Sequence, residues 1–508
     1  MAEAARTRPT PKTSSHVDVL IIGAGISGIG AAAHLTDKQP EKSYLILEAR
    51  DAIGGTWDLF RYPGIRSDSD LHTFCYAFKP WVEERAIADG ESILRYLRET
   101  AAERNIEEQI RFGHRVRAAA WSSAEERWTI EVERGPAAEP VQFTARWLFC
   151  AGGYYRYDSG FVPAFKGVDR FAGPVVHPQF WPADLDYTGQ HVVVIGSGAT
   201  AMTIVPAIAE RAAHVTMLQR TPSYVLAVPG IDPLNERLKR WLGPQRAHRF
   251  SRRQNVLLQS LIYKAARRYP DLVRKLIRAG NVRALPDGYD VDTHFNPPYD
   301  PWDQRLCVVP DGDLFRAIAA GDASVLTDHI ETFTEAGIEL RSGAELRADI
   351  VITATGLNLL ALGGVSYRVD GSPIDLSETI TYKGMMLTGI PNFVYAIGYT
   401  NASWTLKVDV ICEHFCRLLS LLDERGYSYC VPESPHPAAP TRPLLDFAAG
   451  YVQRSVDQFP RQGATVPWEL SMDYRRDRKL LLEGPVGDNL QFAGQRRRTR
   501  DTPRRAAA

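Results

Sequence analysis

Two glycine-rich turns constrain the fold of this 508-residue chain more than any other feature. Each turn follows a short apolar run, at residues 17–22 and 191–195, and precedes a stretch in which apolar residues recur with helical spacing. Further apolar runs at 44–47 and 215–218 complete two strand–helix–strand units. This order is typical of buried parallel strands joined by helices, so the sequence predicts an α/β fold with two Rossmann-like dinucleotide-binding domains.

The first turn contains Gly23, Gly25 and Gly28, in the spacing Gly-x-Gly-x-x-Gly. Gly23 permits a tight turn, Gly25 lets the backbone approach a pyrophosphate, and Gly28 lets the helix pack closely on the strand. Glu48 follows twenty residues after Gly28, at the end of the second strand, where a carboxylate accepts hydrogen bonds from a ribose 2′-hydroxyl. We therefore expect this turn to bind a dinucleotide without a 2′-phosphate.

The second turn contains Gly196, Gly198 and Ala201, and its second strand is followed by Arg220 and Thr221. Arg220 stands where an acidic residue otherwise contacts the ribose, and a guanidinium there favours a 2′-phosphate. The sequence predicts NADP at this turn, with Thr221 as a second phosphate donor; an ordinary surface arginine is the alternative. Two dinucleotide sites in one chain indicate a redox relay, in which NADPH passes hydride to a bound flavin.

The order of the expected strands predicts that the NADP domain is inserted in the FAD domain. Buried strands at 147–150, 349–354 and 393–397 and a helix from about residue 403 to 422 follow this plan. The expected parts are a disordered N-terminus (1–16), the first part of the FAD-binding domain (17–150), an NADP-binding domain (151–345) with a helical insertion (232–285), the second part of the FAD-binding domain (346–494) and a basic disordered tail (495–508).

Charge and cysteine content argue against several other classes of protein. Sixty Lys and Arg balance sixty Asp and Glu, so the net charge is zero and we expect no nucleic-acid partner. Six cysteines without a Cys-x-x-Cys pair indicate neither a disulfide framework nor a metal site, and predict a reduced, cytoplasmic protein. No run of about twenty apolar residues could span a membrane. The basic tail and the Arg- and Leu-rich insertion allow at most peripheral membrane contact, and solvated surfaces are the commoner explanation.

A longer motif lies just before the second turn. Phe171, Gly173, His177, Trp181 and Pro182 match the pattern Phe-x-Gly-x-x-x-His-x-x-x-Trp-Pro, the fingerprint of type I Baeyer–Villiger monooxygenases. The segment from Gly55-Thr56-Trp57 to Asp68 matches a second motif of that family. The chain resembles this family from about residue 17 to 468, and residues 54–70 and 401–407 are similar to its mycobacterial, ethionamide-activating branch.

The resemblance implies FAD and NADP(H) as cofactors. The residues it places at FAD, beside the first glycine turn, are Ser27, Glu48, Gly55, Thr56, Trp57, Asp58, Leu59, Asp68 and Val116. Those it places at NADP are Arg66, Ser67, Asp68, Gly196, Ser197, Gly198, Ala199, Thr200, Ala201, Met202, Arg220 and Thr221. The helix beginning near Ser403 would direct its N-terminus at the flavin, and Trp404 is either a cavity residue or a packed core residue.

The reaction that the resemblance implies is insertion of one oxygen of O2 beside a ketone carbonyl, through a C4a-peroxyflavin, to give an ester or lactone. Arg305 matches the family's active-site arginine, and a fixed guanidinium would stabilise the developing negative charge. Asp68 matches the carboxylate that holds this arginine. A structural ion pair for Arg305 and a turn cap for Asp68 are the alternatives. His177 matches a residue whose family role is more structural than chemical.

Two other functions remain open from the sequence. A flavin N- or S-oxygenase would use the same cofactors, and oxidation of sulfides or thioamides is also expected as a side activity of the resembled family. A non-catalytic nucleotide-binding partner protein is the third hypothesis, prompted by the basic insertion and tail.

Overall fold

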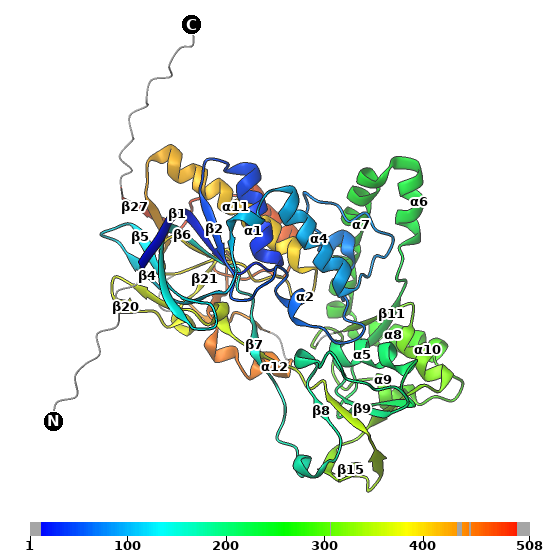
Figure 1. Ribbon diagram of the computed structural model, residues 1–508. Coiled ribbons are helices and arrows are strands. Elements are labelled where there is room, and N and C mark those ends of the chain that lie inside the picture. Colours follow the sequence, from blue (N-terminus) through cyan, green and yellow to red (C-terminus); the bar gives the residue numbers. More distant parts are fainter. Residues whose placement is uncertain (1–11, 305, 434–438, 447–448, 495–508) are drawn as a thin grey trace, which may run out of the picture.

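The computed structural model describes residues 12–304, 306–433, 439–446 and 449–494. It has two α/β parts, each built on its own sheet, with a group of helices projecting from the second part (Figure 1). Arg305 and residues 1–11 and 495–508, including the whole predicted tail, lie outside the described residues.

The first sheet has the strand order β20-β19-β4-β5-β6-β1-β2-β3, and β23 pairs with β6. Its parallel centre is made by β1, β2, β6 and β23, while β4, β5 and β6 pair antiparallel. The strands are β1 (Lys12–Ile22), β2 (Tyr44–Leu47), β3 (Ile110–Arg111), β4 (His114–Ser122), β5 (Arg127–Arg134), β6 (Glu139–Cys150), β19 (Ser366–Val369), β20 (Ser372–Pro373) and β23 (Phe393–Tyr395).

Strand β1 corrects one predicted boundary. It begins at Lys12 and not at Val17, because its parallel pairing with β6 extends back to the pair Lys12 and Val141. Residues 12–16 therefore belong to the sheet and not to the disordered segment expected for 1–16.

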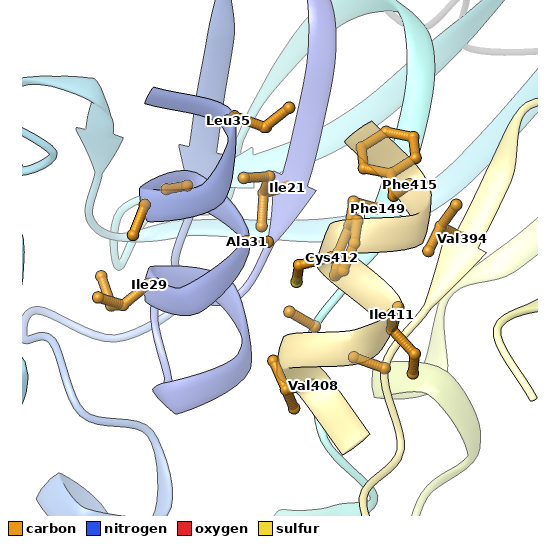
Figure 2. Close-up of a cluster of buried hydrophobic side chains, with 14 of the residues drawn as sticks. Ile21, Ile29, Ala31, Leu35, Phe149, Val394, Val408, Ile411, Cys412 and Phe415 are labelled. Atoms are coloured by element: carbon orange, nitrogen blue, oxygen red, sulfur yellow. The ribbon is translucent and has the colours of Figure 1, made fainter. Parts of the chain in front are cut away.

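The first core lies on both faces of this sheet. Val19 and Ile21 of β1 point to one face and Leu20 and Ile22 to the other, as the two-residue period of a strand requires. Figure 2 shows the first face, where α1 (Ile26–Lys38) and α11 (Trp404–Arg425) pack side by side on β1, β6 and β23. Cys412 of α11 is 1% exposed and belongs to this core.

The second sheet is all parallel, in the order β13-β10-β9-β17-β8. Its elements are β8 (Val175–Val176), β9 (His191–Ile195), β10 (His214–Gln219), β13 (Ala323–Thr327) and β17 (Ile350–Thr353), with helices α5 (Ala199–Ala209) and α10 (Asp313–Ala320). The predicted boundary between residues 345 and 346 is wrong, because β17 pairs with β9 and β8 of this sheet. The chain returns to the first sheet only at β19.

Two short strands join the two parts. β7 (Tyr155–Gly160) leaves the first part and β18 (Leu357–Leu359) returns to it, and the two pair antiparallel. Other elements include α2 (Thr56–Leu59), α3 (Leu71–Phe74), α4 (Gly90–Glu103), α9 (Val291–Phe295), β11 (Val225–Val228), β12 (Cys307–Pro310), β14 (Ile330–Phe333), β15 (Gly337–Leu340) and β16 (Glu345–Arg347).

Three helices occupy nearly all of the range expected for the insertion: α6 (Pro233–Leu242), α7 (Pro244–Arg268) and α8 (Pro270–Ala284). Figure 1 shows α6 away from the second sheet, while α8 contacts α7, α9 and β11. None of the helices in the described part of the chain is long and apolar enough to span a bilayer.

Candidate active site

A single cavity of about 2340 Å3 lies between the two parts, and both glycine turns open into it. Typical ligand pockets have volumes of about 300–1,000 Å3, so this space is large enough for several ligands at once. Gly25 of the first turn and Gly198 of the second both line its wall. The two predicted dinucleotide sites therefore share one space.

The first turn fits the pyrophosphate of a dinucleotide. Helix α1 begins directly after Gly25, with no side-chain cap and no acidic residue in its first turn. Its N-terminal amides are thus left for an anion, and the helix dipole favours negative charge there. The backbone at Gly55 packs closely against this turn. Gly55 has φ of +55°, and a Cβ on it would lie 3.2 Å from Cα of Gly25. A side chain on Gly55 would therefore press against the backbone of the first turn.

Glu48 presents its carboxylate to the same wall. The backbone N–H of Ala24 donates to Oε2 (2.7 Å) and that of Arg50 to Oε1 (2.9 Å). Burial raises the pKa of Glu48, against the opposing effect of these hydrogen bonds. The carboxylate is therefore held in one orientation at the end of β2, where the sequence placed a ribose contact.

The second turn has the same features and more open space. Helix α5 begins after Gly198, again without a side-chain cap or an acidic residue in its first turn, and a Cβ on Gly198 would meet no atom within 4 Å. Gly196 is required by packing as well as by its φ of +138°, since a Cβ there would lie 2.3 Å from the carbonyl oxygen of Ala354. This geometry fits a second pyrophosphate.

Arg220 follows β10 and is exposed on the cavity wall. Within the described residues no carboxylate forms an ion pair with it, so its guanidinium is available to an anion. Thr221 lies beside it on the wall, and its carbonyl oxygen accepts a hydrogen bond of 2.9 Å from the hydroxyl of Ser197. This arrangement fits a ribose 2′-phosphate.

Arg66, Ser67 and Asp68 lie on the loop between α2 and α3, and all three line the cavity. Arg66 forms an ion pair with Asp313, the first residue of α10, and donates a 3.4 Å hydrogen bond to the carbonyl oxygen of Met202. The loop of the first part is thereby tied to two helices of the second. Arg305, the predicted catalytic cation, lies outside the described residues, although its neighbours at 304 and 306 line the cavity.

The cavity brings together most of the predicted cofactor residues. Those on its wall are Gly23, Gly25, Ser27, Glu48, Gly55, Thr56, Trp57, Arg66, Ser67, Asp68, Val116, Gly196, Ser197, Gly198, Ala199, Thr200, Arg220 and Thr221.

Five predicted residues do not lie on the wall, for reasons of packing. A Cβ on Gly28 would lie 1.9 Å from the carbonyl oxygen of Gly23, so Gly28 serves the helix–strand contact. Ala201 and Met202 are buried in the core of the second part, and Leu59 packs against that core.

Asp58, the fifth, is turned away from the wall. Its carboxylate accepts hydrogen bonds of 2.5 Å from Arg50 and from Arg61. Asp58 is therefore a positioning residue for Arg50, which does line the cavity.

The fingerprint residues also lie off the cavity wall. Nδ1 of His177 accepts from the backbone N–H of Gln179 (3.2 Å), so the proton is on Nε2, which donates to the carbonyl oxygen of Gly356 (3.1 Å). Burial lowers the pKa of His177, which favours this neutral form. Gly160 packs directly against the ring, since a Cβ on it would lie 2.1 Å away. His177 thus contacts the ends of both connecting segments, which agrees with a structural role.

The other fingerprint residues belong to the second part. Phe171 is buried in the core and a Cβ on Gly173 would lie 2.1 Å from the carbonyl oxygen of Asp349. Trp181 packs on Tyr187 with ring centroids 6.4 Å apart, and Pro182 follows it, half-buried.

Aromatic residues complete the cavity near the first turn. The indole N–H of Trp404 donates to the hydroxyl of Ser27 (2.8 Å), and its ring lies 5.2 Å from that of Tyr154. Trp404 both lines the cavity and packs on the core, so the two alternatives for it combine. Tyr157, which the sequence did not single out, lies 3.2 Å from Thr56 between hydroxyl oxygens, and burial raises its pKa to about 12. No motif marks Tyr157; only its position after the Gly152-Gly153 turn could have suggested it.

The fold and the site together define a class: a two-domain oxidoreductase with one dinucleotide site in each domain and a common cavity. A family model described as pyridine nucleotide-disulphide oxidoreductase matches residues 20–259. The FAD-containing monooxygenase EthA of Mycobacterium tuberculosis is 52% identical over 482 residues, 94% of this chain and 98% of that protein. The putative FAD-containing monooxygenase MymA of the same species is 49% identical over 94% of this chain and 98% of its own length.

The chain therefore belongs to the family of FAD-containing monooxygenases, flavoenzymes whose cofactors are FAD and NADP(H). Solved structures agree on the fold. An oxidised steroid monooxygenase bound to NADP has a TM-score of 0.73 at 22% identity and covers 94% of this chain and 99% of its own. An open form of cyclohexanone monooxygenase has a TM-score of 0.72 at 18% identity, covering 95% and 100%. The predicted resemblance to Baeyer–Villiger monooxygenases is confirmed.

Proposed function

We propose that this protein is a Baeyer–Villiger monooxygenase that consumes NADPH and inserts one oxygen atom of O2 beside a ketone carbonyl to give an ester or lactone. The observation that carries the proposal is the common cavity, whose wall includes both glycine turns and Asp68. A hydride donor and a flavin bound at these turns would face the same space. The six cysteines are all buried and none of them is in a disulfide bond, which supports action in the reducing cytoplasm.

The chemistry that FAD supplies when bound is the uptake of hydride from NADPH and the activation of dioxygen. The residues that would hold it are Gly25, Ser27, Glu48 and Trp57, while Gly198 and Arg220 would hold NADPH. Helix α11 begins at Trp404 without a side-chain cap, so its dipole favours negative charge at this end of the cavity.

We assign to Arg305 the role of stabilising negative charge during the reaction, because it matches the active-site arginine of the family motif. Its guanidinium would hydrogen-bond to the oxygen of the substrate carbonyl and stabilise the negative charge that develops there. Asp68, half-buried on the cavity wall, would orient that guanidinium by accepting its hydrogen bonds.

The cavity also favours an apolar substrate. Apolar side chains line it on the side of the helical insertion: Leu226, Val228, Ile231, Leu258, Ile262, Leu306 and Val308. These residues would exclude water from the reacting carbonyl and bind hydrocarbon next to it. We propose lipophilic ketones as the main substrates, with S-oxidation of sulfides and thioamides as a side activity.

The test compares a lipophilic ketone with the sulfide of the same shape. With NADPH and air, we expect the ketone to give an ester. We expect kcat/KM for oxidation of the sulfide to its sulfoxide to be lower than kcat/KM for the ketone. Sulfoxide from the sulfide but no ester from any aliphatic, cyclic or aryl ketone would replace the proposal with an S-oxygenase. Purification without flavin and without NADPH oxidation would contradict both.

A further inference from the structure

The helical insertion, residues 232–285, has a charge unlike that of the rest of the chain. It contains fourteen Lys and Arg but only three Asp and Glu, a net charge of +11 in a protein whose total is zero. The remaining residues therefore carry a net charge of −11. Such segregation gives this part of the surface a strong positive potential.

The insertion also exposes most of the large apolar side chains at the surface. Of the 19 that are exposed in the described residues, 12 belong to this segment of 54 residues. Trp241 is 87% exposed at the end of α6, and Phe250 is 50% exposed near the start of α7. Isolated exposed apolar residues need no explanation, but a cluster of this kind marks an interaction surface.

On helix α7 the exposed apolar side chains form a stripe, and basic side chains lie on one side of it. Phe250, Leu257 and Leu261 are 40–55% exposed, and at about 100° per residue they lie within roughly 40° of one another around the helix axis. The exposed basic residues Arg246 and Arg253 lie within roughly 60° of Phe250 on one side of this stripe.

The opposite side of the stripe leads to the candidate active site. Leu258 and Ile262 are also exposed, and both line the cavity. Successive turns of α7 thus connect the apolar residues near its start to the apolar wall where we propose that the substrate binds.

We propose that the helical insertion docks the protein on an anionic phospholipid bilayer, and that lipophilic substrates reach the cavity from the bilayer along α7. An apolar stripe flanked by Lys and Arg is the pattern of a helix that lies in the membrane interface. Trp241 is suited to this interface, where tryptophan is enriched.

The charge argues for lipid over a second copy of this chain. A two-fold contact through this surface would place +11 against +11. An anionic bilayer instead attracts each basic side chain near it.

Flotation with vesicles tests the proposal on the full flavin-loaded protein. We expect the protein to float with vesicles of phosphatidylcholine and phosphatidylglycerol, to stay unbound with phosphatidylcholine alone, and to dissociate in about 1 M NaCl, where the Debye length falls to about 3 Å. A protein that does not float with anionic vesicles at low salt would overturn the proposal.

Two double variants separate the apolar and the charged contributions. Trp241→Ser/Phe250→Ser and Arg246→Glu/Arg253→Glu should each lower the bound fraction at least tenfold, with unchanged thermal unfolding because all four side chains are exposed. Phe112→Ser is the matched control, an exposed aromatic residue outside the insertion (38%), and should float like the parent. Undiminished flotation of both double variants would refute the proposal.

Discussion

The guanidinium of Arg252 donates a hydrogen bond of 3.1 Å from Nη2 to Oδ2 of Asp409, and both side chains are largely buried. The other terminal nitrogen donates to the carbonyl oxygens of His72 (3.2 Å), Thr73 (3.2 Å) and Cys75 (2.8 Å). Helix α7 of the insertion is thereby fixed to α11 and α3 of the first part, which border the cavity. The two parts are joined through this contact as well as through β7 and β18.

Replacing Arg252 should destabilise the protein. In Arg252→Met the carboxylate of Asp409 stays buried without its cation, which costs about 3–5 kcal/mol. The measurement is urea-induced unfolding followed by circular dichroism, with Arg253→Met, an exposed neighbour, as control. Equal free energies of unfolding for the two variants would mean that the contact of Arg252 with Asp409 does not stabilise the protein.

Arg220 should determine the choice between NADPH and NADH. Arg220→Ala removes the guanidinium that we expect to bind the 2′-phosphate, an interaction worth about 1.5–3 kcal/mol, so KM for NADPH should rise about tenfold or more. KM for NADH should hardly change. Arg211→Ala, an exposed arginine off the cavity wall, should affect neither value. A parallel loss with both nucleotides would argue against a phosphate contact.

The stability of the protein should fall between about pH 6.5 and pH 4. His414 donates from Nδ1 to the carbonyl oxygen of Leu481 (2.7 Å), and burial lowers its pKa to about 4. The unfolded chain takes up this proton near pH 6.5 and the folded chain only near pH 4. This contribution to stability is therefore complete above pH 6.5 and is lost as the pH falls towards 4. The total loss is about 3.5 kcal/mol, at ~1.4 kcal/mol per pKa unit.

His414→Gln should remove this part of the pH dependence. The free energy of unfolding, measured by urea titration from pH 7 to pH 4, should fall less steeply in the variant. Burial also lowers the pKa of His248 to about 4, so a weaker slope of the same sign should remain. Superimposable curves for the variant and the parent would contradict the assignment.

Arg305 and Asp68 should act after the hydride step. In Arg305→Ala, reduction of the flavin by NADPH, followed by stopped-flow absorbance, should stay within about threefold of the parent, while ester formation falls by 100-fold or more because one charge-stabilising donor is lost. Asp68→Asn should weaken the same step less. Ester formation at the parental rate in Arg305→Ala would remove this residue from its role.

Much of the fold could be predicted because the determining signals are local. Gly23 and Gly196 both adopt positive φ where the sequence requires tight turns, and the flanking strands and helices follow. Helix α11, expected from about 403 to 422, spans 404–425. These patterns depend on residues within a few positions of one another, so one sequence suffices to recognise them.

Pairings between distant segments could not be predicted. The assignment of β17 to the second sheet depends on partners about 160 residues earlier, and nothing local distinguishes it from a strand of the first sheet. The contact of Arg66 with Asp313 spans 247 residues, and that of Arg252 with Asp409 spans 157. The orientation of Asp58 towards Arg50 likewise follows from packing, which the motif does not contain.

The most direct test of the account uses isotope-labelled oxygen. A lipophilic ketone is incubated with the purified protein, NADPH and 18O2, and the product is analysed by mass spectrometry. The account predicts an ester or lactone that carries one 18O in its ring or alkoxy position, formed with one NADPH consumed per ester. An unlabelled ester, or NADPH oxidation that yields only hydrogen peroxide with every ketone, would contradict it.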